Sequence, residues 1–86
     1  MPEISRFYGI VIQMYYGDHS PPHFHARYAG QSAKIDIDTL AIIEGKLPGR
    51  ALGLVIEWAA LHQQELRDAF QNAANLEPPG KIEPLA

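Results

Sequence analysis

Residues 23–38, HFHARYAGQSAKIDID, decide the fold, because apolar and polar side chains alternate on both sides of a central Ala29-Gly30 step. Such alternation is typical of β-strands that bury one face. Ala29 and Gly30 fit a two-residue turn that joins strand 23–28 to strand 31–38. The sequence therefore predicts an antiparallel hairpin centred on this turn.

The turn also determines which residues of the two strands lie opposite each other. A slip of one residue would mix apolar with polar side chains, so we expect the register in which each face stays uniform. The expected cross-strand pairs are Tyr28–Gln31, Arg27–Ser32, Ala26–Ala33, His25–Lys34, Phe24–Ile35 and His23–Asp36. The face toward the core then carries Phe24, Ala26, Ala33, Ile35 and Ile37, and the opposite face carries His23, His25, Arg27, Lys34 and Asp36.

Two further strands flank the hairpin. Residues Ile4–Tyr16 are rich in aromatic and β-branched side chains and read as one strand, in which Gly9 marks a bend or bulge near residues 7–9. Residues 17–22, GDHSPP, form a loop, because glycine, aspartate and two prolines cannot continue a central strand. A short fourth strand is expected over residues 41–44, ending at Gly45.

A single helix is expected over residues 50–75, where apolar side chains recur with the helical period. Its main apolar stripe consists of Leu52, Val55, Ile56, Ala59, Leu66, Ala69, Phe70 and Ala73, with His62 on the flank as a structural histidine. Such a helix spans about 39 Å, which exceeds the expected width of the sheet. Pro78, Pro79 and Gly80 end it, and residues 81–86 return as an extended tail through Ile82 and Leu85.

These elements predict the α+β class: a small curled antiparallel sheet of about four strands, with one long C-terminal helix packed on one face. The 86 residues suit one domain, 1–86. The absence of cysteine excludes disulfide scaffolds, thiolate metal sites and thiol catalysis. The net charge of −3 gives no indication of nucleic-acid binding, and the chain has no apolar run that could span a membrane. We expect a soluble cytoplasmic protein.

Three of the four histidines, His19, His23 and His25, fall within seven positions. His23 and His25 are two residues apart on a strand, so both side chains project from the same face and can chelate one metal ion. His19 from the loop and Asp36 from the opposite strand complete a candidate ligand set for a divalent metal such as Zn²⁺ or Ni²⁺. The alternative is a polar sheet face on which His23 only pairs with Asp36.

The same residues are candidates for acid–base catalysis. Histidine titrates near neutral pH, and a carboxylate partner fixes its tautomer. With Arg27 and Lys34 available to hold a phosphate, His23, His25, Arg27 and Asp36 suit a metal-independent ribonuclease.

A second apolar flank of the helix consists of Leu54, Trp58 and Leu61. Either the sheet curls far enough to cover them, or they form an interface with another chain, because exposed apolar clusters around an aromatic residue mark such surfaces. On the second interpretation we expect Trp58 to lie uncovered in the monomer, and a homodimer or a complex with another small protein to cover it.

The chain resembles the domain-of-unknown-function family DUF4160 over nearly its whole length. The most specific part of the resemblance is DHSPPHFH, residues 18–25, and the segment GKLP at residues 45–48 and Trp58 also match. One departure is Leu40, near which the family usually has glycine, so this turn is expected to be built differently.

The resemblance implies a small prokaryotic protein that is often encoded beside a protein of the DUF2442 family, in a toxin–antitoxin-like pair. It transfers no biochemical activity. The sequence is therefore compatible with three functions: an interaction module that works with a neighbouring-gene partner, a histidine-dependent ribonuclease, and a metal-binding protein that uses the Asp18–His25 cluster.

Overall fold

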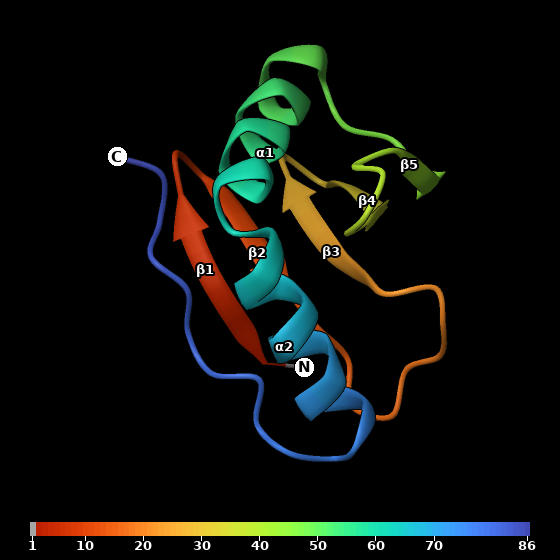
Figure 1. Ribbon diagram of the computed structural model, residues 1–86. Helices are drawn as coiled ribbons and strands as arrows, with labels where there is room; N and C mark the ends of the chain where they lie inside the picture. The colour runs from red at the N-terminus through yellow and green to blue at the C-terminus, as the bar shows by residue number, and fades with distance from the viewer. Residues whose placement is uncertain (1) are drawn as a thin grey trace.

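The computed structural model describes residues 2–86. Five strands form one antiparallel sheet in the order of the chain, and two helices lie across one face of it (Figure 1). The elements are β1 (Glu3–Phe7), β2 (Ile10–Gln13), β3 (His23–Tyr28), β4 (Gln31–Asp36), β5 (Ile42–Gly45), α1 (Gly49–Leu61) and α2 (Gln63–Ala74). The α+β class is confirmed, but the sheet has five strands and the helical segment consists of two helices. No helix within these residues is long and apolar enough to cross a lipid bilayer.

The segment predicted as one strand, Ile4–Tyr16, is instead a hairpin of β1 and β2 that turns at Tyr8 and Gly9. Both turn residues have positive φ, 49° and 80°, as a tight two-residue hairpin turn requires. Because the chain reverses here, Phe7 is buried and Tyr8 is exposed, which is the opposite of what an uninterrupted strand would give.

The register predicted for the central hairpin is confirmed in full. β3 and β4 pair Phe24 with Ile35, Ala26 with Ala33 and His25 with Lys34. The side chains predicted to face the helices are all buried, and Phe24, Ala26 and Ile35 are completely inaccessible to solvent. The alternation of apolar and polar residues therefore identifies the face toward the core. His23, predicted to face away from the helices, is an exception, because it is 3% exposed and its ring lies 5.4 Å from that of Phe70 on α2.

The helical segment is broken at His62, whose backbone angles, φ −128° and ψ 26°, lie outside the helical range. The single long helix was therefore wrong. The periodicity of apolar residues did not indicate the break, because a single non-helical residue changes the direction of the chain and leaves the 3.6-residue spacing nearly unchanged. The buried residues on the two sides of the break still follow one stripe: Ala51, Val55, Trp58 and Ala59 on α1, and Leu66, Ala69, Phe70 and Ala73 on α2. Leu52 and Ile56 of the predicted stripe are half-buried.

Trp58 belongs to the core, which corrects the expectation that it lies uncovered on a second flank of the helix. The indole is fully buried between the rings of Phe7 and Phe24, and its Nε1–H donates a hydrogen bond to the main-chain oxygen of Glu83 at 2.7 Å. Leu54 is half-buried and Leu61 is 69% exposed, so the three residues do not form one exposed surface. The curled sheet and the C-terminal tail together cover a wider sector of the helix than a flat sheet of four strands would.

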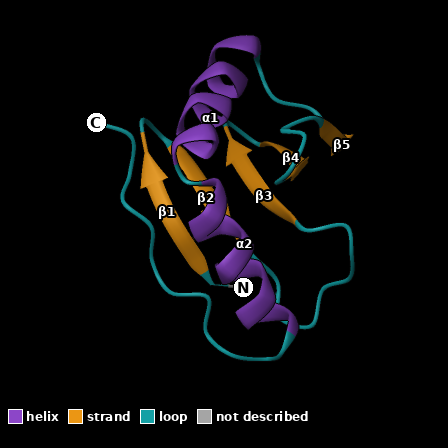
Figure 2. Ribbon diagram, in the orientation of Figure 1, coloured by secondary structure: helices purple, strands orange, loops and turns teal. Residues whose placement is uncertain are grey.

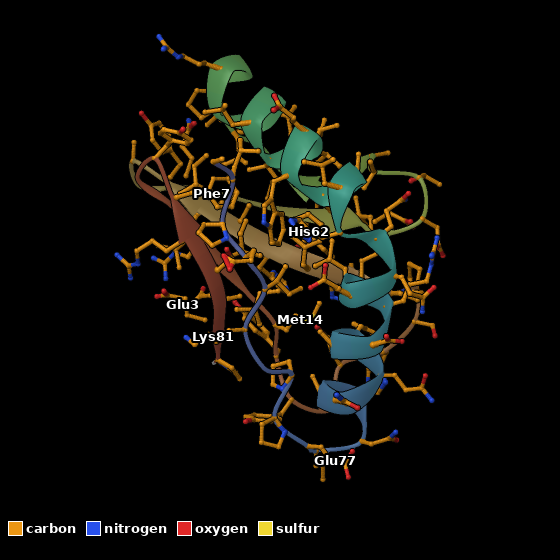
Figure 3. The ribbon with its side chains drawn as sticks, turned by 60° about the vertical axis from the view of Figure 1, so that its left-hand side comes forward. Glu3, Phe7, Met14, His62, Glu77 and Lys81 are labelled. Carbon is orange, nitrogen blue, oxygen red and sulfur yellow. The ribbon has the colours of Figure 1, made fainter. Side chains whose placement is uncertain are left out.

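The C-terminal tail runs along β1 as an extended strap (Figure 2), as predicted for Ile82 and Leu85. The backbone N–H of Ile82 donates to the main-chain oxygen of Ile4 at 2.8 Å, and Lys81 Nζ donates to that of Glu3 at the same distance. Figure 3 shows Glu3 and Lys81 close together on this side of the molecule. The tail thus covers the outer edge of β1.

The other edge of the sheet is β5, close to the predicted strand 41–44. All four of its residues are exposed, and the pairing with β4 is interrupted by an irregularity at Ile43. In the turn before it, Leu40 has φ 61°, a conformation that glycine adopts more easily. Leu40 therefore adopts the left-handed conformation that the glycine usual in the family would adopt more easily.

Candidate metal and acid–base site

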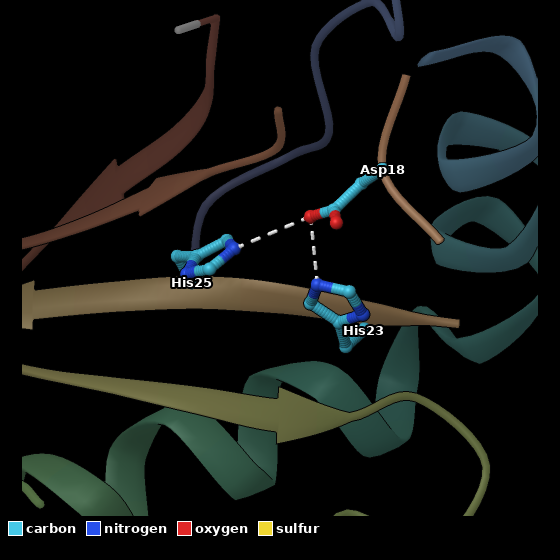
Figure 4. Close-up of side chains that lie close together, drawn as sticks. All are labelled: Asp18, His23 and His25. Atoms are coloured by element: carbon cyan, nitrogen blue, oxygen red, sulfur yellow. Dashed lines mark hydrogen bonds and ion pairs between the residues drawn. The ribbon is translucent and has the colours of Figure 1, made fainter. Parts of the chain in front are cut away.

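The connection between β2 and β3 folds back over the start of β3 and brings Asp18 to His23 and His25 (Figure 4). One carboxylate oxygen and one ring nitrogen from each histidine all lie within 4.8 Å of one another. The two histidines are the first and third residues of β3, so the two-residue period of the strand aims both rings at the same place.

The connection is anchored at both ends by main-chain hydrogen bonds. The N–H of Gly17 donates to the carbonyl of Ala73 at the end of α2, at 2.8 Å, and the N–H of Ile37 donates to the carbonyl of Pro22 at 3.0 Å. The loop that carries Asp18 is therefore fastened to both the helical layer and the sheet, so the site is held in place by the fold itself.

His23 is buried, with 3% of its side chain exposed, and both ring nitrogens face oxygen atoms. Nδ1 lies 2.7 Å from the main-chain oxygen of Pro21, and Nε2 lies 2.8 Å from Asp18 Oδ2. A carbonyl and a carboxylate both only accept hydrogen bonds, so the ring satisfies both partners when both nitrogens carry protons. Both sides of the ring are thus held by oxygen atoms of the loop.

His25 approaches the same carboxylate oxygen but does not bond to it. Its Nε2 lies 3.6 Å from Asp18 Oδ2, is buried, and has no hydrogen-bond partner among the described residues. The ring is held in its orientation by Tyr15, which stacks on it with a centroid distance of 4.1 Å. Burial is the main cause that lowers the pKa of His25, and the nearby charge of His23 lowers it further. His25 thus presents a neutral, unused nitrogen to the centre of the cluster.

Asp18 is ionised at neutral pH. Burial is the largest single influence on the pKa of Asp18, and it raises that pKa. Two other influences lower it and together outweigh burial. The backbone N–H of His19 donates to Oδ1 at 3.0 Å, and His23 contributes both its charge and a hydrogen bond. The net pKa of Asp18 lies below its usual value. One oxygen of the carboxylate is thus held by the loop backbone, and the other faces the two histidines.

We expect acid to destabilise the protein in two stages. The lowered pKa of His25 means that the unfolded chain takes up a proton first as the pH falls below about 6.5, so the free energy of unfolding decreases there. The stabilisation from Asp18 is fully present above about 3.9 and is lost as the pH falls further, through its lowered folded-state pKa. Urea unfolding between pH 8 and pH 3 measures both stages, and His25→Gln is expected to remove the first. Equal slopes for the two proteins between pH 7 and pH 5 would contradict this assignment.

The structure places the other predicted site residues outside the cluster. Asp36 lies opposite His23 in the register, as predicted, but its Oδ1 accepts hydrogen bonds from the backbone N–H groups of Asp38 and Thr39 in the following turn. His19 is exposed and contributes its backbone N–H to Asp18, and its ring is outside the three-residue cluster. Arg27 is exposed on β3, two residues beyond His25. Neither the Asp36 carboxylate nor the His19 ring thus belongs to the cluster of Asp18, His23 and His25.

Two residues of the site were not identified from the sequence. The ligand set predicted from the sequence does not include Asp18, and Tyr15 is predicted only as part of the strand Ile4–Tyr16. The signal for Asp18 lies in DHSPPHFH itself, since a loop that reverses between neighbouring antiparallel strands brings its first residues back beside the start of the second strand.

His62, predicted as a structural histidine, has that role. Its ring packs against Trp58, and its Nδ1 lies 2.6 Å from a carboxylate oxygen of Glu65 one turn along α2. It lies at the break between the helices and takes no part in the cluster.

Comparison with known protein families gives one match: the family described as a domain of unknown function, DUF4160, matches residues 9–71. This range contains Asp18, His23 and His25, and leaves out β1 and the C-terminal tail. Searches of curated proteins and of solved structures found no match.

Proposed function

The chain belongs to the DUF4160 family, and because that description assigns no activity, we propose from the site geometry that the protein binds one divalent metal ion through Asp18, His23 and His25. The observation that carries the proposal is the buried Nε2 of His25. Within residues 2–86 this nitrogen has no hydrogen-bond partner, yet it lies close to a carboxylate and a second imidazole. A buried polar atom without a partner requires an explanation, and an ion at this point supplies one.

The distances between the ligand atoms suit a metal. In a tetrahedral zinc site with bonds of 2.0–2.1 Å, neighbouring ligand atoms lie about 3.4 Å apart. Asp18 Oδ2 lies 2.8 Å from His23 Nε2 and 3.6 Å from His25 Nε2, so small side-chain movements bring both distances to this value. The metal would replace the proton between His23 and Asp18.

The surroundings of His23 support the same conclusion. Histidines that bind metals usually donate their other ring N–H to a carboxylate or main-chain carbonyl, which fixes the ring and its tautomer. The Nδ1 of His23 has this contact with Pro21. Its Nε2 is thus directed toward the cluster before any metal binds.

The ligand set indicates which metals to test. Two imidazoles and one carboxylate suit Zn²⁺, Ni²⁺ and Fe²⁺, and three protein ligands leave coordination positions for water or a substrate. A metal held by Asp18, His23 and His25 would supply Lewis-acid chemistry, including a lowered pKa of any water bound to it.

A metal titration tests the proposal. We expect Zn²⁺ or Ni²⁺ at pH 7.5 to raise the melting temperature and to bind with a stoichiometry of one, because a ligand that binds only the folded state stabilises it, by about 2.7 kcal/mol at 100 times Kd. The gain should fade toward pH 5.5, where protonated imidazoles no longer bind metal.

Two variants make this test specific. His25→Gln removes one ligand and should abolish the gain, whereas His19→Gln removes an exposed neighbouring histidine and should retain it. An unchanged melting temperature at saturating metal, or an equal loss in both variants, would exclude the site.

A second candidate is acid–base catalysis without a metal, as in a ribonuclease. The supporting observation is that the two rings have different environments: both nitrogens of His23 face oxygen acceptors, whereas burial lowers the pKa of His25. Such a pair supplies one acid and one base, and Arg27 on the same strand is available for a phosphate. Cleavage of RNA that persists in EDTA and disappears in His25→Gln would support this function.

A role in a two-protein, toxin–antitoxin-like system is a separate proposal that rests on the family resemblance. The open edge of β5, with Ile42 and Ile43 both exposed, supports it as a place where another chain can add a strand. Co-expression with the neighbouring open reading frame tests it, and Ile43→Glu should reduce co-purification.

A further inference from the structure

A pocket of about 470 Å³ lies between the N-terminal part of α1 and the β1–β2 turn. It is lined by Tyr8, Ile10, Tyr28, Arg50, Ala51 and Leu54. Tyr28 lies three residues beyond His25 on β3, about 10 Å at about 3.3 Å per residue, and the alternation along the strand places the two side chains on opposite faces of the sheet. It is therefore a separate site that does not depend on the proposed metal.

Both aromatic walls of the pocket are held in position. The hydroxyl of Tyr8 donates a hydrogen bond to the main-chain oxygen of Ala86 at 2.7 Å, which ties this exposed ring to the C-terminal tail. The ring of Tyr28 lies against Gly9, where an added Cβ would be 3.4 Å from Cε1. Gly9 thus leaves the space that Tyr28 occupies.

Arg50 is the one charged residue in the lining. Within residues 2–86, Arg50 forms no ion pair, and the first turn of α1 contains no acidic residue that could neutralise it. Arginine binds planar oxyanions through two parallel hydrogen bonds and stacks on aromatic rings. The remaining walls are apolar or aromatic, so a flat ring is accommodated beside an anionic group.

We propose that this pocket binds a small planar aromatic anion, with the ring against Tyr8, Tyr28 and Leu54 and the anionic group on Arg50. A cation is disfavoured, because the lining contains no carboxylate. A metal is disfavoured for the same reason and because the lining contains no imidazole.

Titration with indole-3-acetate, followed by the backbone amide signals of Gly9, Ala51 and Leu54, tests the proposal. We expect saturable shifts at these residues with a Kd below about 1 mM. The neutral analogue indole-3-acetamide should bind about tenfold more weakly, because it lacks the charge-assisted contact with Arg50.

Variants separate the contributions of the charge and the rings. Arg50→Gln, at an exposed position, should lose the preference for the anion, so that both compounds bind with equal affinity. Tyr28→Leu should weaken both compounds, and Lys34→Gln, on the other face of the sheet, should change neither. Equal binding of the two compounds to the wild type, shifts that map elsewhere, or no saturable shift would each overturn the proposal.

Discussion

Trp58→Ala is expected to lower the free energy of unfolding by about 3–5 kcal/mol, the usual cost of deleting a large buried aromatic side chain. The indole is fully buried, lies 5.3 Å from the ring of Phe7 and 5.9 Å from that of Phe24, and bonds to Glu83 in the tail. The substitution removes the contact between the helix, the sheet and the tail at one point. In a domain of 86 residues this is a large share of the total stability.

Urea unfolding measures the effect, and Leu61→Ala is the matched control. Leu61 lies on the same helix but is 69% exposed, so its truncation should change stability by less than about 0.5 kcal/mol. Trp58→Phe retains an aromatic ring and loses the hydrogen bond to Glu83, so an intermediate loss is expected. If Trp58→Ala folded normally and only changed the association state in sedimentation, the residue would belong to an interface after all.

Gly45→Ala is expected to destabilise the protein by at least about 2 kcal/mol. Gly45 ends β5 with φ 82°, where any other residue is strained. An added Cβ would also lie 2.2 Å from the main-chain oxygen of Ser32 and 3.1 Å from Cα of Ala33. Both atoms belong to the backbone of β4, so the sheet edge itself has to move.

The matched control for this substitution has the opposite sign. Gly53 lies inside α1 and an added Cβ would meet nothing within 4 Å, so Gly53→Ala should stabilise the protein by about 0.5–1 kcal/mol through its better helix propensity. Thermal unfolding of the two variants should therefore give shifts in opposite directions. A stability loss for Gly45→Ala no larger than about 0.5 kcal/mol would mean that β5 is not packed on β4 as described.

The central hairpin could be predicted in detail because its two strands bury one face only. Each cross-strand pair then has a single favourable register, and the observed pairing of β3 with β4 agrees with it. The first hairpin was missed although Tyr8-Gly9 and Ala29-Gly30 have the same turn angles. An irregularity between Glu3 and Ser5 buries both Ile4 and Ser5, so the alternation in β1 is disturbed and the sequence reads as one long apolar strand.

The two histidines of the site could be predicted because they also lie on a regular strand. His23 and His25 were brought together by the period of a strand, which depends only on their spacing. Asp18 comes from a loop, whose path depends on hydrogen bonds between distant segments, such as that of Gly17 with Ala73. These contacts form only when the helices are in place, so the sequence of the loop alone does not show where its carboxylate lies. Asp36 was chosen because it is opposite His23, but a nearby turn uses its side chain.

The tail along β1 makes the two edges of the sheet unlike each other. Residues 81–82 occupy one edge, and β5 is exposed along the other. A chain that adds to the sheet by strand pairing therefore has one place to bind. Two copies joined through β5 would be related by a twofold axis, and the combined sheet would end in a covered β1 at both sides. Edge-to-edge association through β5 would therefore stop at a pair and would not extend into a fibre.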